Sequence, residues 1–200
     1  MGLESRMFTL TAEPRPLLYQ LSLDVPDGLE FEQVDWKSII VSADSKTKFY
    51  LRQTCSEFNH LPVLSEFCKN IQEQQSTLLE RLWQHPFFKS EWGGYTYDQL
   101  KSNTSPYCEL CKDLPGFDTG IHLDCRQTVT AGMVFFNHNV IEEKSTTFYG
   151  DHSGNSPIMM PCAFGQGWYS ANNPFSWHSG GNYSNDLRYS IKFGYHLNII

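Results

Sequence analysis

The stretch His122-Leu-Asp124-Cys-Arg-Gln-Thr128-Val-Thr-Ala-Gly-Met-Val-Phe-Phe136 places an H-x-D triplet just before a run of β-branched and aromatic residues. Such a run, which contains few helix-favouring residues, predicts a strand over 128–136. If the triplet is extended as well, period-two alternation puts the side chains of His122 and Asp124 on the same face. The stretch therefore predicts a β-rich C-terminal half with an imidazole and a carboxylate pointing the same way.

Two further pieces of the C-terminal half complete the pattern. His178 precedes Ser179-Gly-Gly-Asn182, which has the composition of a turn, and residues 187–197 form a predicted strand beyond it. In that strand Arg188, Ser190 and Lys192 share one face. The other face carries Tyr189, Ile191, Phe193 and Tyr195. A hairpin through the Gly-Gly-Asn turn would lay Arg188 near the strand of His178, deeper in the same cavity.

The residue types in these pieces suit a metal centre. Two imidazoles and one carboxylate, here His178, His122 and Asp124, are a complete ligand set for a non-haem iron that keeps open positions. Arg188 adds a planar guanidinium fork that matches a carboxylate. Each piece alone is common by chance, and most isolated H-x-D triplets hold no metal. Their order along the chain, on predicted strands, favours the joint interpretation.

The pattern resembles the Fe(II)/2-oxoglutarate-dependent dioxygenase superfamily over about residues 105–197. The resemblance implies His122, Asp124 and His178 as iron ligands, and Arg188 with Ser190 as the site of the distal carboxylate of 2-oxoglutarate. Further matching stretches are Asp113-Leu-Pro-Gly-Phe117, Ser145-Thr-Thr-Phe-Tyr149 and Trp168-Tyr-Ser-Ala-Asn-Asn173. The departures are Thr146, where a glycine is common, and Cys125-Arg126 after the carboxylate.

The resemblance also implies a fold, cofactors and a reaction. The fold is mainly β with a flanking helix: a double-stranded β-helix, or cupin-like jelly roll, of eight strands. The cofactors are Fe(II), 2-oxoglutarate as co-substrate, and O2. The reaction is the hydroxylation of a small molecule or of an exposed residue on a partner, with release of succinate and carbon dioxide. No catalytic acid or base beyond the metal ligands is implied, and desaturation or cyclisation stays open.

Two other hypotheses remain. One is a non-catalytic metal-binding or ligand-binding jelly-roll module, and the other is a metal-dependent cupin enzyme that does not use 2-oxoglutarate. Arg188 argues against both, because neither needs a cation at that place. If Arg188 does not bind the co-substrate, Arg126 and Lys192 are the alternative cations.

The N-terminal half has a clear helix and weaker strand signals. Apolar residues recur at three- and four-residue steps over 62–85, where Pro62 suits the first turn and Pro86 ends the helix. Residues 17–25 alternate as a strand does, and 36–41 and 48–51 are weaker strand candidates. Residues 87–97 are predicted to be an aromatic-rich connection. We expect the helix to pack its apolar stripe against the outer face of a sheet.

Composition limits the remaining possibilities. A chain of 200 residues suits a single domain over 1–200, with N-terminal strands and a supporting helix over 1–104 and the jelly-roll core over 105–200. The net charge of −7 disfavours a nucleic-acid partner. The sequence has no apolar leader and no span of transmembrane length, so we expect a cytoplasmic protein without a membrane partner. The C-x-x-C pair of Cys108 and Cys111 has no second pair, which favours free thiols over zinc. The oligomeric state is not readable.

Overall fold

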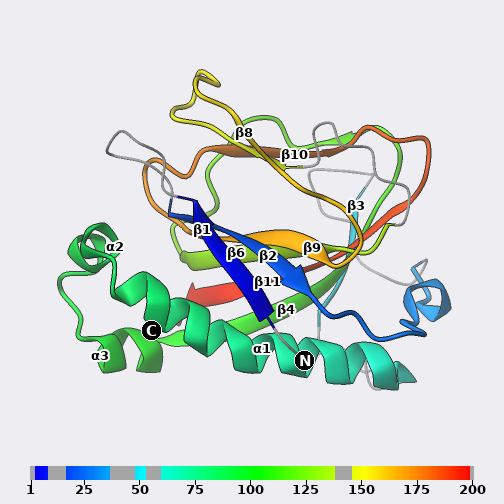
Figure 1. Ribbon diagram of the computed structural model, residues 1–200, viewed down its shortest axis with the longest axis horizontal. Helices are drawn as coiled ribbons and strands as arrows, with labels where there is room; N and C mark the ends of the chain where they lie inside the picture. Colours follow the sequence, from blue (N-terminus) through cyan, green and yellow to red (C-terminus); the bar gives the residue numbers. More distant parts are fainter. Residues whose placement is uncertain (1–2, 9–16, 37–47, 53–59, 138–145, 199–200) are drawn as a thin grey trace.

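The computed structural model describes residues 3–8, 17–36, 48–52, 60–137 and 146–198. Within these ranges two antiparallel sheets face each other, and a long helix covers the outer face of the larger sheet (Figure 1). The larger sheet has seven described strands in the order β1-β2-β9-β6-β11-β4-β3. The strands are β1 (Leu3–Phe8), β2 (Leu18–Leu23), β3 (Lys48–Arg52), β4 (Thr104–Asp113), β6 (Thr128–Phe135), β9 (Gln166–Ala171) and β11 (Arg188–Leu197).

The smaller sheet has four described strands in the order β5-β10-β7-β8. They are β5 (Phe117–Asp118), β7 (Thr146–Phe148), β8 (Ile158–Met160) and β10 (His178–Asn182). Two stacked antiparallel sheets, with consecutive strands passing from one sheet to the other, form a jelly roll. The prediction of a mainly β jelly roll with a flanking helix is confirmed.

The central strands of the large sheet separate two environments. On β11, Tyr189, Ile191 and Phe193 belong to the core beneath the helix, whereas Arg188 and Ser190 are buried on the opposite face. This alternation is the one that the sequence predicts for residues 187–197. On the helix side the rings of Phe193 and Tyr169 stack with centroids 5.8 Å apart. Gly132 of β6 lies beneath both rings, and a Cβ there would come within 2.8 Å of each.

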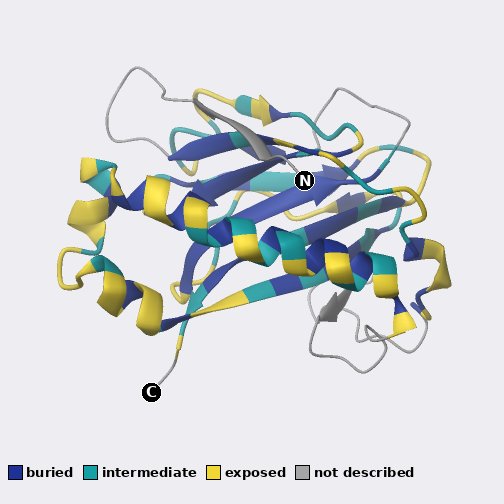
Figure 2. Ribbon diagram, turned by 60° about the horizontal axis from the view of Figure 1, so that its bottom comes forward, coloured by how far each residue is buried: buried dark blue, intermediate teal, exposed yellow. Residues whose placement is uncertain are grey.

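Helix α1 (Pro62–Trp83) buries one stripe against the sheet and exposes the other (Figure 2). The buried stripe includes Leu64, Phe67, Ile71, Leu78 and Leu82. Its N-cap residue has no side-chain hydrogen bond, and the buried Glu30 takes over this role by accepting from the backbone N–H of Val63 (3.1 Å) and of Leu64 (2.8 Å). A carboxylate at a helix N-terminus satisfies free donors and complements the helix dipole. The predicted helix and its packing are confirmed.

Residues 86–102 are more regular than the sequence suggests. The predicted connection over 87–97 is wrong in its first part, because α2 (Pro86–Glu91) begins there, and α3 (Tyr97–Ser102) follows. Both helices begin with a capping side chain: His85 Nδ1 accepts from the N–H of Phe87, and Thr96 forms a capping box with Gln99. Such local capping is readable in sequence, and here the many aromatic residues obscured it.

Two of the three strands predicted in the N-terminal half are present among the described residues. Strand β2 lies within the predicted 17–25, and β3 matches 48–51. Of the candidate at 36–41, Trp36 lies in a turn and 37–41 lie outside the described residues. No helix in the described ranges is long and apolar enough to cross a bilayer.

The predicted Gly-Gly-Asn turn is wrong. Residues 178–182 form β10, which pairs with β5 and β7 in the small sheet, so β10 and β11 are not a hairpin. The chain crosses between the two sheets after Asn182. Gly181 sits in this strand because the ring of Tyr183 packs where its Cβ would be. The H-x-D triplet also departs from a strand: His122 makes one isolated bridge to His178, and Leu123 and Asp124 continue as a loop.

Candidate metal centre and adjoining pocket

Three side chains from distant parts of the chain converge between the two sheets. The backbones of His122 and His178 pair in both directions, with N–O distances of 2.8 and 2.9 Å. This bridge sets their rings side by side, with centroids 4.4 Å apart. The chain then turns so that Asp124 joins them, and one ligand atom from each of the three residues lies within 4.8 Å of the others. The structure thus brings together all three residues that the sequence singles out.

Each imidazole is held through its Nδ1 atom. Nδ1 of His122 lies 3.1 Å from the carbonyl oxygen of Gly120, and Nδ1 of His178 lies 2.9 Å from that of Ser176. A carbonyl oxygen only accepts, so Nδ1 is the donor in both contacts, and Nε2 is the ring nitrogen left for another partner. Burial lowers the pKa of His178, which favours the neutral imidazole. This is the protonation state and orientation that a metal requires.

The carboxylate of Asp124 is held by a lysine. Lys192 Nζ lies 3.5 Å from Asp124 Oδ1. Burial alone would raise the pKa of Asp124, but electrostatic attraction, chiefly to the Lys192 ammonium, outweighs it, so the pKa lies below its ordinary value. For Lys192, burial would lower the pKa, and the opposing attraction of Asp124 and Glu109 raises it instead. Both groups are therefore charged at neutral pH.

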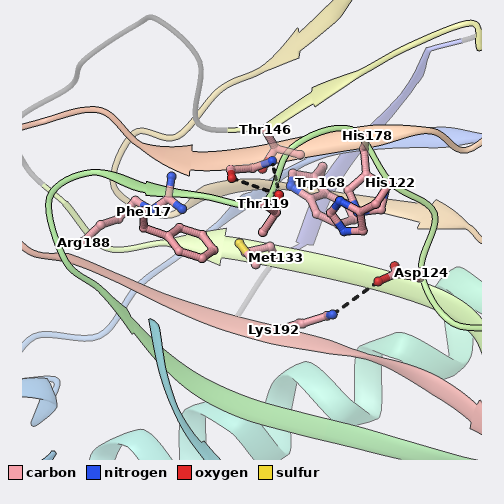
Figure 3. A pocket seen from close by; sticks show the side chains of 11 residues that line it. Phe117, Thr119, His122, Asp124, Met133, Thr146, Trp168, His178, Arg188 and Lys192 are labelled. Carbon is pink, nitrogen blue, oxygen red and sulfur yellow. Dashed lines mark hydrogen bonds and ion pairs between the residues drawn. The ribbon is translucent and has the colours of Figure 1, made fainter. Parts of the chain in front are cut away.

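A pocket with a volume of about 70 Å³ extends from these residues toward Arg188. Figure 3 shows the two histidines and Asp124 at one end and Arg188 at the other, with Phe117 and Met133 between them. Thr119 and Thr146 also lie between the two ends, so the pocket has charged or metal-binding groups at its ends and a mixture of apolar and hydroxyl side chains between them. A small molecule with a carboxylate at each end of a short carbon chain likewise carries its charges at its two ends.

Arg188 is buried and tied to its surroundings on three sides. Its Nε and one terminal nitrogen donate to Asp113 Oδ2 at 2.9 and 2.6 Å, and its other terminal nitrogen donates to the carbonyl oxygen of Gly181. The guanidinium carbon lies 5.2 Å from the ring centre of Phe135. These bonds use three of the five N–H groups of an arginine and fix the plane of the fork.

Two buried polar atoms beside the pocket have no hydrogen-bond partner among the described residues. They are the Oγ of Ser190, which lies between Arg188 and Lys192 on the same face of β11, and the Nε1 of Trp168, whose side chain lines the pocket. Buried polar groups are rarely left without a partner, so such atoms indicate a missing ligand or water. The hydroxyl and the indole N–H both suit an oxygen-rich ligand.

Sequence reasoning missed two partners of the predicted residues. Asp113 appeared only within the Asp-Leu-Pro-Gly-Phe stretch, yet it pairs with Arg188. Lys192 appeared only as an alternative cation for the co-substrate, yet it pairs with Asp124. Register carries the signal in the first case, because Asp113 lies directly opposite Arg188 across the β4–β11 pair. The strand order that creates this pairing cannot be read from one sequence. Arg126, the other alternative cation, lies outside the pocket that holds Arg188.

Comparisons with known proteins give structural matches only. No family model matches the sequence, and no curated protein matches it either. Among solved structures, a prolyl-4-hydroxylase from Pseudomonas putida aligns with a TM-score of 0.58 at 8% identity, covering 85% of this chain and 83% of that one. The dioxygenase for auxin oxidation 1 from Arabidopsis thaliana, solved with 2-oxoglutarate, aligns with a TM-score of 0.56 at 9% identity, covering 80% of this chain and 66% of that one.

These neighbours fit the two-sheet architecture described above. Their identities are low, so the likeness concerns the arrangement of the backbone and leaves the chemistry to be argued from the residues. The chain has the double-stranded β-helix fold of the 2-oxoglutarate- and Fe(II)-dependent oxygenases.

Proposed function

We propose that the protein is an iron- and 2-oxoglutarate-dependent oxygenase, and specifically a hydroxylase. The observation that carries this proposal is the convergence of His122, Asp124 and His178 at one end of a pocket whose other end is a buried guanidinium. A metal-binding module without catalysis has no need of Arg188, and neither has a cupin enzyme that works without 2-oxoglutarate.

The donor set fits Fe(II). The two Nε2 atoms and one carboxylate oxygen leave part of the coordination sphere open, as the facial triad of non-haem iron enzymes does. When bound, iron and 2-oxoglutarate together would activate O2, so that one oxygen atom enters a substrate C–H bond and the other enters succinate, with loss of carbon dioxide. The contacts of Nδ1 and of Lys192 orient the donors before the metal arrives.

The far end of the pocket fits the distal carboxylate of 2-oxoglutarate. Arg188 provides the cation and Ser190 a hydroxyl without another described partner. Asp113 holds the guanidinium so that its remaining N–H groups are directed before the ligand binds. A charge-assisted hydrogen bond of this kind contributes about 1.5–3 kcal/mol. Because Asp113 also neutralises Arg188, recognition here rests on directed hydrogen bonds more than on net charge.

The substrate class is less defined than the cofactors. One structural neighbour is by name a prolyl-4-hydroxylase and another a dioxygenase for auxin oxidation, so proteins of this fold act on different kinds of substrate. We propose hydroxylation of a small molecule or of an exposed residue on a partner. Nucleic acid fits poorly with a net charge of −7.

The test is the binding of Fe(II) and 2-oxoglutarate without oxygen. Chelation of the metal by 2-oxoglutarate is expected to give a weak visible charge-transfer absorption, and admitting O2 is expected to yield succinate. Asp124→Ala should abolish both, while Asp98→Ala, at an exposed position on α3, should leave both unchanged. Arg188→Lys should raise the 2-oxoglutarate concentration needed and leave iron binding nearly normal, because Lys cannot form the planar fork.

Two outcomes would reject the proposal. A folded wild-type protein that binds Fe(II) but shows no absorption with 2-oxoglutarate would indicate the non-catalytic module. Succinate formation that survives in Asp124→Ala would show that the metal lies elsewhere.

A further inference from the structure

A second cavity, larger than the first, adjoins the metal centre. Its volume is about 310 Å³, and Asp124 lines both cavities. Its walls come from the loop after the H-x-D triplet, the loop after β9 and the C-terminal end of α2. Pockets for small molecules begin at about this volume. A reactant in the second cavity would lie beside a proposed metal ligand while 2-oxoglutarate occupied the first.

The walls of this cavity are held in place by the side chains of two asparagines. Asn172 Nδ2 donates to the carbonyl oxygens of Cys125 (3.0 Å) and Thr128 (2.9 Å), which joins the two loops. Asn173 Oδ1 accepts from the N–H of Phe175 at 2.8 Å and shapes the turn that leads to His178. These amides are used within the protein, so they build the cavity and leave recognition to other groups.

Two opposite charges on the cavity wall are available to a ligand. Glu91 and Arg126 are exposed, and neither side chain has a hydrogen bond or ion pair with another residue in the described part of the chain. They also do not pair with each other. The rest of the lining includes the apolar side chains of Trp92, Leu123 and Pro174. Asp124 also lines the cavity, but it is paired with Lys192. The cavity thus offers one unpaired cation, one unpaired anion and an apolar surface.

We propose that this cavity binds the substrate and that the substrate is a small amphoteric molecule, with a carboxylate placed at Arg126 and an ammonium group at Glu91. A free amino acid is the simplest example of the class. A singly charged acid would satisfy Arg126 but bring its charge toward Glu91 and Asp124. A singly charged amine would leave Arg126 without a partner. The inference rests on the proposed function, because it assigns the substrate of that same centre.

The experiment compares how tightly matched compounds bind to the metal-free protein. For each side chain the set holds the free amino acid, its N-acetyl derivative, its amide and its N-acetyl amide, which are amphoteric, anionic, cationic and neutral. Ligand-observed NMR measures binding, and succinate formation with Fe(II), 2-oxoglutarate and O2 measures coupling. For at least one choice of side chain, we expect the free amino acid to bind more tightly than the other three compounds of its set and to stimulate succinate formation.

Two variants test the assigned contacts. Arg126→Gln is expected to weaken the binding of the free amino acid by about 10- to 100-fold, as loss of one charge-assisted bond would, and to make the amide its equal. Glu91→Gln removes the partner of the ammonium group. It should weaken the binding of the free amino acid by a similar factor, so that the N-acetyl derivative binds as tightly as the free amino acid. Lys69→Gln and Glu66→Gln change exposed charges on α1 and are the controls.

The inference and the proposed function can fail separately. If another class binds better than the free amino acids, if no free amino acid binds, or if the two variants bind as the wild type does, the inference is overturned. Binding is measured without metal, so these results stand whatever the outcome of the 2-oxoglutarate chelation test, which alone decides the proposed function.

Discussion

The two faces of the large sheet have opposite chemistry although the same strands build them. Toward α1, strand β11 presents Ile191 and Phe193 to an apolar core. Toward the small sheet the same strand presents Arg188 and Lys192 to the pocket, with the buried Ser190 between them on the same face. Alternation along one strand therefore divides the protein into a face that stabilises it and a face that binds ligands. The pair of Arg188 and Asp113 is the exception, because it lies on the binding face and yet, as an ion pair buried to 6% and 0% side-chain exposure, it also affects stability.

The largest expected effect tests the apolar face. Phe193→Ala removes a buried ring that stacks on Tyr169 above Gly132, and the small residue beneath cannot fill the space. We expect a loss of about 3–5 kcal/mol in the free energy of unfolding. Urea unfolding measures it, and the fraction that stays folded should still bind Fe(II) and 2-oxoglutarate. A change in cofactor affinity without a loss of stability would break the division between the faces.

The next effect tests the exception. Asp113→Ala leaves the Arg188 guanidinium buried without its partner, and we expect a loss of about 3–5 kcal/mol in the free energy of unfolding. Replacing both residues, as Asp113→Leu with Arg188→Met, should recover most of the stability because neither charge remains. The double variant should still fail to bind 2-oxoglutarate in a titration followed by visible absorption. Recovery of 2-oxoglutarate binding in the double variant would remove Arg188 from the site.

The outer face was readable from the sequence because its signals are periodic. Apolar steps of three and four residues gave α1, and alternation after residue 187 gave both faces of β11. The same signals cannot show which strands lie side by side, so the Asp113–Arg188 pair stayed hidden. The prediction of a turn at Ser179-Gly-Gly-Asn182 failed for a tertiary reason, because pairing with β5 and β7, which are distant in the sequence, holds these residues in a strand.

The candidate site was readable only as a set of residue types. His122, Asp124 and His178 were identified from order and chemistry, and the structure brings their ligand atoms together. The condition that the whole H-x-D triplet is extended is not met, since a single bridge to His178 orients the first histidine and a loop carries Asp124. Alternation along the strand placed Lys192 on the correct face of β11, but its partner Asp124 comes from a loop whose path no local pattern predicts.

A smaller effect, on metal affinity, is expected at the metal-binding end of the pocket. Lys192→Met removes the partner of Asp124 from a place where both side chains are partly exposed, at 25% and 12%, so the cost in stability should be small. Loss of a group that orients a metal ligand typically lowers metal affinity by about 10- to 100-fold. Titration of the metal-free protein with Co(II) measures this. Lys112→Met, which removes the cation over Trp36, is the control and should bind Co(II) as the wild type does.

The smallest effect separates binding from stability most clearly. The Ser190 Oγ is buried without a hydrogen-bond partner among the described residues, so Ser190→Ala should leave the free energy of unfolding unchanged or raise it slightly. If this hydroxyl donates to the distal carboxylate of 2-oxoglutarate, the same change should weaken co-substrate binding by about 2- to 12-fold, the value of one hydrogen bond of about 0.5–1.5 kcal/mol. Urea unfolding and a 2-oxoglutarate titration measure the two quantities, with Ser22→Ala, at an exposed position on β2, as the control. A variant that lost stability but kept its co-substrate affinity would assign Ser190 to the packing of the sheet. Arg188 and Lys192 would then be the residues of β11 that contribute to binding.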